Sequence, residues 1–583
     1  MKRLPLALSL LVLPFYAAAA PAWVEESNEH AQVFIDVLGE FQPEVLSYFG
    51  IEGFDDQVTD FGPDNPTRFR NALSIARDEL QRRHDREENP LVREDLAIMI
   101  RSANETIDTS LIEEAHLVPF TNAGRNMFQG LFVLLQPDVP AARKRLALDR
   151  LRAYVGLAPN STPLTTSIRA RYEEAMADGS KLPPFQGEVA EAVANTGRFV
   201  AGLRDGFSGD DWNAADVDPA LDALEAQLED YEAWVRETVM PAARDNHQLP
   251  AAVYAQNLIG FGLDIAPEEL MERAQQAFTE IRNEMQTLAA LIAKERGWTV
   301  TDYRDVIREL KKEQLAPDEV IPFYRDIIAQ AEDIIRRERI VTLPERDMVI
   351  RLASEAETAS QPAPHMDPPP LTGDSDEPGV FVLTAGVPTT EGEAPAGYDD
   401  FTFAAGTWTL TAHEGRPGHE LQFTAMVERG VSLARSFFAF NSVNVEGWAL
   451  YAEAELKPYE PLEGQLIALQ HRLLRASRAF LDPMLNLGLA TPDDARRVLS
   501  EDVVLSEAMV TQEVDRYTFR APGQATSYFY GYIRLMALRA ATEVALGERF
   551  DRLAFNDFVI GQGLLPPELL ATAVRNDFIP SQQ

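Results

Sequence analysis

Cysteine is absent from all 583 residues of the sequence. Without a thiol, the chain can form no disulfide and cannot carry a lipid through a thioether bond. Small exported domains commonly rely on disulfides for stability. If this chain is exported, we expect a large apolar core to supply that stability instead. A chain of this length is long enough for several cores or for one large two-lobed domain.

Basic residues are also scarce. The sequence has 53 Lys and Arg against 92 Asp and Glu, which gives a formal net charge of −39. A surface of this kind repels nucleic acid and anionic membranes, so we expect neither as a partner. The plainer interpretation is that the acidic residues keep the protein soluble.

Long hydrophobic runs are missing too, so we expect no stable membrane insertion. The apolar run over residues 4–16 is too short to span a bilayer. It follows Lys2 and Arg3 and precedes four alanines, which is the pattern of a cleaved export signal. We therefore expect residues 1–20 to be a signal peptide and the chain to be exported to the periplasm or exterior of a bacterium. The sequence indicates no oligomeric state.

Helical periodicity dominates the remainder, so the predicted fold class is mainly α. Apolar residues recur every three or four positions between Pro267 and Gly297, which suit the start and the end of a helix. Residues 221–239, 317–340 and 492–517 show the same pattern, and Thr491 is expected to cap the last of these. These stripes predict a mainly helical N-terminal part over residues 21–360.

Eight prolines between residues 361 and 398 exclude a helix from that stretch. Within it, Gly379 to Ala385 has the β-branched and aromatic residues that favour a strand. A helix is expected again from about Phe403. We expect residues 361–583 to form a second part of the chain that contains a small β-sheet.

Two of the 8 histidines, His413 and His419, lie in one short window with Glu414 beside the first. In the common His-Glu-x-x-His arrangement the histidines are four residues apart and share a helix face. Here they are six apart, which on a regular helix places them about 120° from each other. Pro417 and its neighbour Gly418 favour a break between them, which would allow both to reach one metal ion. The alternative is a pair of structural histidines.

A catalytic zinc site needs three protein ligands and one open position. Glu446 is the best third ligand, and Glu453 lies two helical turns further on the same face. Apolar residues surround both, and a buried carboxylate needs a partner. We expect Glu446 to bind the metal and Glu453 to orient a histidine from behind. The alternative is that both glutamates are solvated surface charges.

Glu414 then has a separate task, because it follows the first ligand. The metal lowers the pKa of a bound water, and Glu414 would take its proton as the water attacks a carbonyl carbon. Tyr528 is the first choice for stabilising the oxyanion, with Tyr532 on the same helical face. Arg516 and Arg520 would bind a substrate carboxylate. Tyrosines of this kind commonly serve packing, and arginines commonly form surface ion pairs.

Three sequence blocks resemble a bacterial metallopeptidase-like family known as domain of unknown function 885. They are His-Glu-x-x-x-Gly-His-x-x-Gln, ending at Gln422, then Glu-Gly-Trp-Ala from Glu446, and Pro-Gly-Gln-Ala…Tyr…Gly from Pro522 to Gly531. The resemblance implies a zincin of the gluzincin type, with two His and one Glu on zinc (Zn²⁺). It also implies a largely helical fold with a deep cleft. Gln422 joins the residues expected to support the site or bind substrate.

One stretch departs from the family pattern. Members commonly have Asp-x-Gly-Leu-His between the second and third blocks, whereas this chain has Asp482-Pro-Met-Leu-Asn486. If that histidine binds substrate or the oxyanion, this chain has lost or changed that contribution.

The combined prediction is a zinc-dependent peptidase that hydrolyses short peptides. Residues 361–583 would be its metal-binding catalytic part, with the small β-sheet near the metal helix. Two imidazoles and a carboxylate suit zinc, with manganese or cobalt as possible substitutes. The predicted strand at residues 379–385 would bind an extended peptide along its edge, or would be an ordinary core strand. The alternatives are a catalytically inactive peptide-binding protein on a zincin fold and a metal-dependent amidase with a non-peptide substrate.

Overall fold

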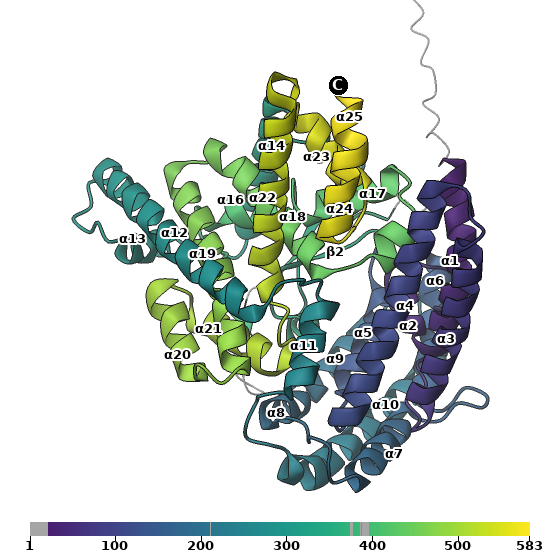
Figure 1. Cartoon of the computed structure of the whole chain (residues 1–583). Helices are drawn as coiled ribbons and strands as arrows, with labels where there is room; N and C mark the ends of the chain where they lie inside the picture. The colour runs from purple at the N-terminus through teal and green to yellow at the C-terminus, as the bar shows by residue number, and fades with distance from the viewer. Residues whose placement is uncertain (1–20, 210, 373–376, 385, 388–395) are drawn as a thin grey trace, which may run out of the picture.

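The protein is mainly helical, as predicted. The computed structural model describes residues 21–209, 211–372, 377–384, 386–387 and 396–583 (Figure 1), so the predicted signal peptide over residues 1–20 lies outside the described residues. Within the described ranges, no helix is both long and apolar enough to cross a membrane.

The helices fall into three successive groups along the chain. The first is α1 (Ala22–Phe41), α2 (Pro43–Tyr48), α3 (Asn65–His84), α4 (Pro90–His116), α5 (Ala123–Leu135), α6 (Ala141–Tyr154), α7 (Leu164–Ala177), α8 (Gln186–Ala194), α9 (Thr196–Gly206) and α10 (Ala214–Trp234). The second is α11 (Ala251–Gly260), α12 (Pro267–Arg296), α13 (Tyr303–Leu310), α14 (Val320–Glu338) and α15 (Glu355–Ser360). The third is α16 (Gly406–Glu414), α17 (His419–Glu428), α18 (Ser442–Leu456), α19 (Leu462–Asn486), α20 (Pro492–Arg497), α21 (Glu507–Asp515), α22 (Thr526–Leu546), α23 (Arg552–Gly561), α24 (Pro567–Ala573) and α25 (Ile579–Ser581).

Wider or tighter helical turns extend several of these helices. Segments of π-helix cover Val235–Val239, Ala434–Phe438, Val498–Asp502, Arg516–Arg520 and Val574–Phe578, and short 3₁₀ segments cover Met240–Ala242, Lys457–Tyr459 and Gly547–Arg549.

Three apolar cores hold the helices together. One lies between α12 and α19, which pack along each other. A second joins α1, α3 and α4, which run side by side (Figure 1), to α16, α17, α18 and α23. The third lies among α5 to α10. The second core contains residues from both sides of position 360. The predicted division of the chain into residues 21–360 and 361–583 remains a prediction.

Three of the four predicted apolar stripes form helices close to their expected bounds. Helix α12 begins at Pro267 and ends before Gly297, whose φ of 66° is the left-handed conformation of a helix C-terminus. The stripes at 221–239 and 317–340 fall on α10 with its π-helical extension and on α14.

The fourth prediction, one helix over residues 492–517, is wrong. Thr491 does cap α20, but the helical path stops after Asp502 and resumes at Glu507. Asp400 accepts hydrogen bonds from the backbone N–H and the hydroxyl of Ser506, and Val504 has a φ of 66°. A partner distant in sequence therefore fixes the break.

A three-stranded sheet has the order β1 (Val349–Leu352), β3 (Val380–Leu383), β2 (His365–Asp367). Strand β1 runs parallel to β3 and β2 runs antiparallel to it. The two-residue strands β4 (Gly386–Val387) and β5 (Ala396–Gly397) form a separate pair. Strand β2 packs against α17, so the sheet lies near the helix that carries His419.

The predicted strand at 379–385 is present as β3, but both of its edges are already paired. It therefore cannot bind a peptide along an edge, and that interpretation is wrong. Phe381 and Val382 are fully buried, so β3 is an ordinary core strand, the alternative that the sequence left open. Ala385 lies outside the described residues.

Candidate metal centre

The chain bends between the two histidines. Helix α16 ends at Glu414 and α17 begins at His419, so the predicted interruption is present. Gly418 is required at this bend, because a Cβ atom there would lie 1.9 Å from the carbonyl oxygen of His413. The link between the helices is thus too tight for any residue with a side chain at position 418.

Side chains from other elements hold this bend. The indole N–H of Trp448 on α18 donates a hydrogen bond of 3.0 Å to the carbonyl of Pro417. The Arg416 guanidinium donates to Glu420 and to Glu332, both at 2.7 Å. The bend is therefore fixed to α14, α17 and α18.

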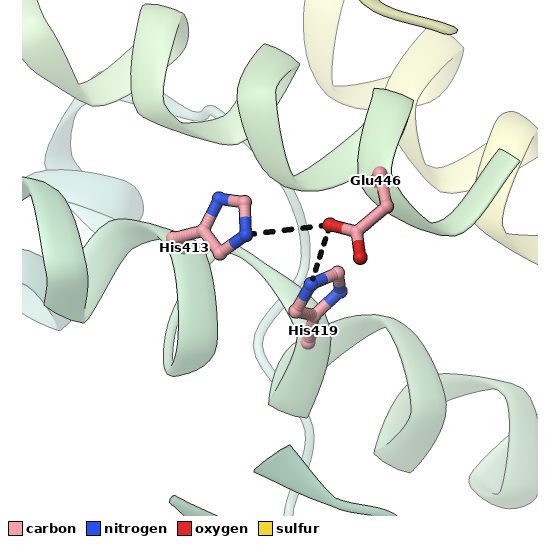
Figure 2. Close-up of side chains that lie close together, drawn as sticks. All are labelled: His413, His419 and Glu446. Atoms are coloured by element: carbon pink, nitrogen blue, oxygen red, sulfur yellow. Dashed lines mark ion pairs between the residues drawn. The ribbon is translucent and has the colours of Figure 1, made fainter. Parts of the chain in front are cut away.

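The bend brings His413 and His419 to face Glu446 of α18 (Figure 2). Glu446 Oε2 lies 3.4 Å from Nε2 of His413 and 3.3 Å from Nε2 of His419. All three side chains are largely buried. In the described part of the chain, Oε2 of Glu446 and Nδ1 of His419 have no hydrogen-bond partner.

These separations fit a zinc ion. Zinc in a tetrahedral site lies about 2.0–2.1 Å from nitrogen and oxygen ligands, so two such ligands are about 3.3 Å apart. A buried carboxylate oxygen that lacks a hydrogen bond is costly, and a cation would satisfy it. The three predicted ligands therefore form a donor set that suits zinc.

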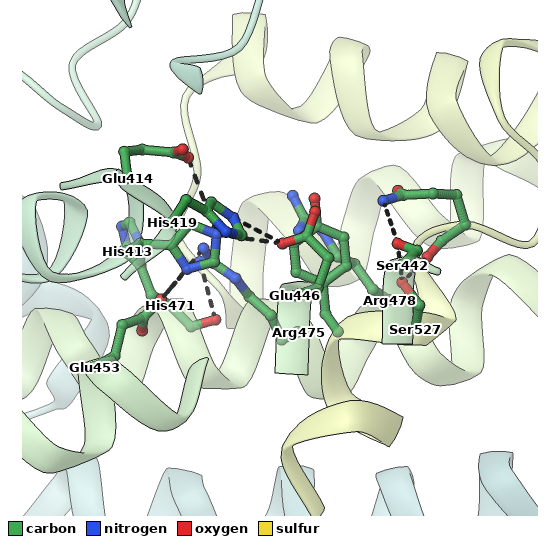
Figure 3. A network of polar contacts seen from close by, with 12 residues as sticks. His413, Glu414, His419, Ser442, Glu446, Glu453, His471, Arg475, Arg478 and Ser527 are labelled. Atoms are coloured by element: carbon green, nitrogen blue, oxygen red, sulfur yellow. Dashed lines mark hydrogen bonds and ion pairs between the residues drawn. The ribbon is translucent and has the colours of Figure 1, made fainter. Parts of the chain in front are cut away.

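Glu453 sits behind His413, as expected for a residue that orients a ligand (Figure 3). Its Oε1 lies 2.7 Å from Nδ1 of His413, and its Oε2 accepts a hydrogen bond from Thr409. Burial alone would raise the pKa of Glu453, but Arg475 and His413 outweigh it and lower the pKa to about 2. Glu453 is thus an ionised carboxylate that accepts a hydrogen bond from the Nδ1–H of His413 and leaves Nε2 free for a metal.

Glu414 lies next to the three ligands. Its Oε1 is 4.0 Å from Nε2 of His413, and both side chains are visible in Figure 3. Burial raises the pKa of Glu414 to about 7; Glu446 adds to the increase, and His419 opposes it. A carboxylate with a pKa near neutrality is suited to accept and return a proton.

Two glycines set how closely α18 and α22 approach each other beside the site. A Cβ atom on Gly447 would lie 2.6 Å from the carbonyl carbon of Gly531, and one on Gly531 would lie 2.0 Å from the carbonyl oxygen of Val443. Glu446 precedes the first glycine and Tyr528 lies three residues before the second. The close crossing therefore determines how the candidate ligand and the tyrosine face each other.

Tyr528 lies over His413, with ring centroids 6.2 Å apart and planes only 9° from parallel. Arg516 donates a hydrogen bond of 3.2 Å to the Tyr528 oxygen. Burial raises the pKa of Tyr528, so the phenol stays protonated at neutral pH. With its oxygen already accepting a bond, its own O–H is available to a further acceptor.

The remaining predicted residues lie further from the three ligands. Gln422 is buried and donates to Asn444, which ties α17 to α18. Tyr532 packs against the guanidinium of Arg472 and does not line the cavity that Tyr528 lines. Arg520 forms an ion pair with Glu191.

Asn486 also lies away from the cavity. Its side-chain N–H groups donate to the Asp482 carboxylate and to the backbone carbonyls of Asp482 and Tyr517. Asp482 in turn accepts the Gly523 N–H. The departure from the family pattern therefore affects the support of the loop before α22 and does not reach the candidate ligands.

The sequence prediction missed three side chains on one face of α19, one neutral imidazole and two guanidinium groups. His471, Arg475 and Arg478 line the same small cavity as His413 and Glu414. They recur at intervals of four and three residues in an otherwise apolar helix, and that pattern is the signal by which they could have been found.

The fold and the site together define a helical protein with a buried two-histidine, one-glutamate centre between α16, α17 and α18. The chain matches the family described as bacterial protein of unknown function (DUF885) over residues 43–574, and it belongs to that family.

Two solved structures share the fold. One is the crystal structure of a candidate lipoprotein from Colwellia psychrerythraea, with a TM-score of 0.75, 17% identity, and coverage of 96% of this chain and 99% of the other. The second is a candidate lipoprotein of unknown function from Shewanella oneidensis, with a TM-score of 0.70, 17% identity, and coverage of 96% and 100%. No curated protein matches the sequence.

Proposed function

We propose that this protein is a zinc-dependent peptidase that hydrolyses short peptides. The observation that supports this most strongly is the convergence of three buried side chains, His413, His419 and Glu446. The Glu446 oxygen lies 3.4 and 3.3 Å from the two Nε2 atoms, which suits one zinc ion, and ligand atoms of all three lie within 4.8 Å of one another. The Glu446 oxygen has no other partner in the described residues.

A zinc ion in this position would supply a Lewis acid and make water acidic near neutral pH. Glu414 is placed to accept the proton of the attacking water and to deliver it to the leaving nitrogen, because its carboxylate lies beside the ligands and its pKa is close to neutrality. Glu453 holds the ring of His413 in one orientation throughout.

Tyr528 is placed to stabilise the oxyanion that forms at the substrate carbonyl. Its phenol stays protonated, and the hydrogen bond from Arg516 occupies its oxygen, so its O–H is free to donate. The cavity beside His413 and Glu414 has a volume of about 50 Å³ and admits only a small group, so the surface of a folded protein does not fit into it.

Replacing Glu414 by Gln tests this function directly. Glu414→Gln should lower the rate of peptide hydrolysis by a factor of about 10² or more, because the amide cannot take a proton. The zinc content measured by elemental analysis should stay the same. The matched control is Glu272→Gln, which changes an exposed glutamate on α12. Full activity of Glu414→Gln on a mixed peptide pool, or wild-type activity that survives a chelator, would overturn the proposal.

The inactive peptide-binding alternative relied on the change at Asn486. That residue makes its hydrogen bonds away from the cavity, so it gives the alternative no support. The amidase alternative requires the same residues and differs only in substrate. Comparing hydrolysis of peptides with that of non-peptide amides decides between the two.

We also propose that the protein acts in the bacterial envelope or exterior. The export signal predicted for residues 1–20 supports this, as do the two structural relatives described as candidate lipoproteins. The large excess of acidic residues supports a peptide partner over nucleic acid.

A further inference from the structure

The cavity beside His413 and Glu414 has three arginines in its wall: Arg475, Arg478 and Arg516. Arg475 and Arg478 reach from α19 toward Glu446 and the two histidines (Figure 3), while Arg516 comes from the π-helical segment before α22. A volume of about 50 Å³ holds a few waters or a small polar group. The carboxylates of Asp400 and Glu414 also line this space, and Asp400 is already paired with Lys311. The guanidinium groups outnumber the carboxylates, which favours an anion.

Only one of these arginines is matched by a carboxylate of its own. Glu513 accepts two hydrogen bonds from Arg478, at 2.7 and 2.6 Å, and is fully buried. The same carboxylate lies 4.0 Å from Arg516, beyond hydrogen-bond distance. Arg478 is therefore fully paired within the fold, whereas Arg516 reaches the same carboxylate only at the limit of an ion pair and makes no hydrogen bond to it.

Arg475 also has unused capacity. Its ion-pair partner Glu453 lies 3.5 Å away and is shared with His413. The Arg475 side chain is only 6% exposed. Its Nε is buried and has no hydrogen-bond partner among the described residues. A buried guanidinium with an unused donor is costly unless an anion binds it.

A single aromatic ring separates these arginines from the candidate metal ligands. The guanidinium carbons of Arg475 and Arg516 are each 5.9 Å from the centroid of the Tyr528 ring, which lies 6.2 Å from that of His413. An extended peptide spans at most about 3.3–3.6 Å per residue. A substrate therefore reaches from the ligands to the arginines within about four residues at most.

We propose that Arg475 and Arg516 bind a substrate carboxylate, and that the enzyme cleaves peptides near a free C-terminus. This rests on the proposed peptidase function and adds the substrate class. An acidic side chain close to the cleaved bond offers the same chemistry, so the experiment must separate a terminal carboxylate from a side-chain one.

Binding measured by calorimetry tests the carboxylate site without hydrolysis. Three probes are used: N-acetyl-leucine, N-acetyl-leucinamide and the α-amide of N-acetyl-aspartic acid. The last of these has only its side-chain carboxylate free. Glu414→Gln protein is used with zinc and again with a chelator, so that a carboxylate cannot bind through the metal alone. We expect N-acetyl-leucine to bind at least about 30-fold more tightly than its amide in both conditions. Equal binding of acid and amide overturns the proposal, and tight binding of the aspartic probe alone assigns the site to acidic side chains.

Variants on α19 locate the site. Arg475→Met should remove the preference for the acid over the amide. Arg472→Met is the matched control, because Arg472 packs on Tyr532 outside the cavity and its loss should leave that preference unchanged. Thermal melting checks that both variants fold. If a variant does not fold, the comparison of acid with amide binding in the Glu414→Gln protein still tests the proposal.

Hydrolysis of peptide pairs separates this inference from the proposed function. Each pair has one sequence with either a free or an amidated C-terminus, and kcat/KM should fall at least about 30-fold on amidation. Equal cleavage of both overturns the carboxylate site and leaves the peptidase function standing. Binding of the free acid without cleavage of either peptide supports the carboxylate site and contradicts the peptidase function.

Discussion

Glu453 determines which nitrogen of His413 faces the candidate metal, since its carboxylate accepts from Nδ1 at 2.7 Å. Glu453→Gln removes the charge and offers only a weaker or misplaced acceptor. We expect zinc affinity to fall about 10–100-fold, the usual effect of losing such a partner. Competition with a chromophoric chelator measures the affinity. Thr409→Ser keeps the hydroxyl that bonds Glu453 and should bind zinc normally; unchanged affinity in Glu453→Gln would contradict this role.

Glu460 gives a pH dependence of stability. Burial raises its pKa to about 8; Glu453 adds to the increase, and Lys457 and Arg472 oppose it. The folded protein therefore keeps a proton on Glu460 that the unfolded chain releases above about pH 4. The stability from this group is complete below that pH and is lost as the pH rises through about 8.

Glu460→Gln should consequently raise the free energy of unfolding at pH 8 by about 2–4 kcal/mol and change it little at pH 4. Denaturant unfolding at both pH values checks this, with Glu272→Gln as an exposed control. A variant less stable than wild type at pH 8 would show that Glu460 is ionised and paired in the folded protein.

The placement of the candidate ligands could largely be predicted from the sequence, because residue types and spacing indicate which side chains can meet; their chemistry stays a prediction. His413, His419 and Glu446 converge as expected, and Glu453 lies behind His413. The arginines of α19 were missed because their spacing places them on one helix face but does not show what that face meets until the surrounding helices are in place. Tyr532 shares a helix with Tyr528 but packs on Arg472.

At the level of elements, the crossing of α18 and α22 depends on Gly447 and Gly531. Gly447→Ala places a methyl group against the backbone of α22 and should cost about 1–3 kcal/mol through overpacking. It should also weaken zinc binding, because Glu446 moves with its neighbour. Gly561→Ala on α23 is the matched control, since its Cβ would meet no atom within 4 Å. Melting temperature and zinc affinity are measured together; a Gly447→Ala protein that matches wild type in both would contradict this explanation.

Periodicity predicted elements well where a helix depends on its own sequence and poorly where a distant residue intervenes. Helix α12 follows its apolar stripe from Pro267 to Arg296. The equally regular stripe at 492–517 is broken because Asp400 binds Ser506. Similarly, the composition of β3 predicted a strand, whereas its pairing with β1 and β2 depends on segments far apart in the chain.

On the scale of the whole molecule, the three candidate ligands lie on helices that are already held by apolar packing. Trp408, Ala412, Leu421 and Trp448, from α16, α17 and α18, belong to one core with α1, α3 and α4. The sequence predicted helices on both sides of this core but not their contact, since tertiary packing leaves no local periodicity. The site therefore does not depend on a metal to assemble it, unlike small domains that fold only when zinc binds.

Removing the metal should accordingly lower stability without unfolding the protein. A ligand that binds only the folded state raises the free energy of unfolding by about 4 kcal/mol at a concentration 1,000 times its Kd. A chelator should therefore lower the Tm by several degrees, while the helical circular dichroism at 25 °C stays the same. Glu446→Gln, which removes one ligand, should melt at the same temperature with and without chelator. A wild-type Tm that ignores both zinc and chelator would show that no metal binds between α16, α17 and α18. Loss of helicity on chelation would show instead that the metal holds the cores together.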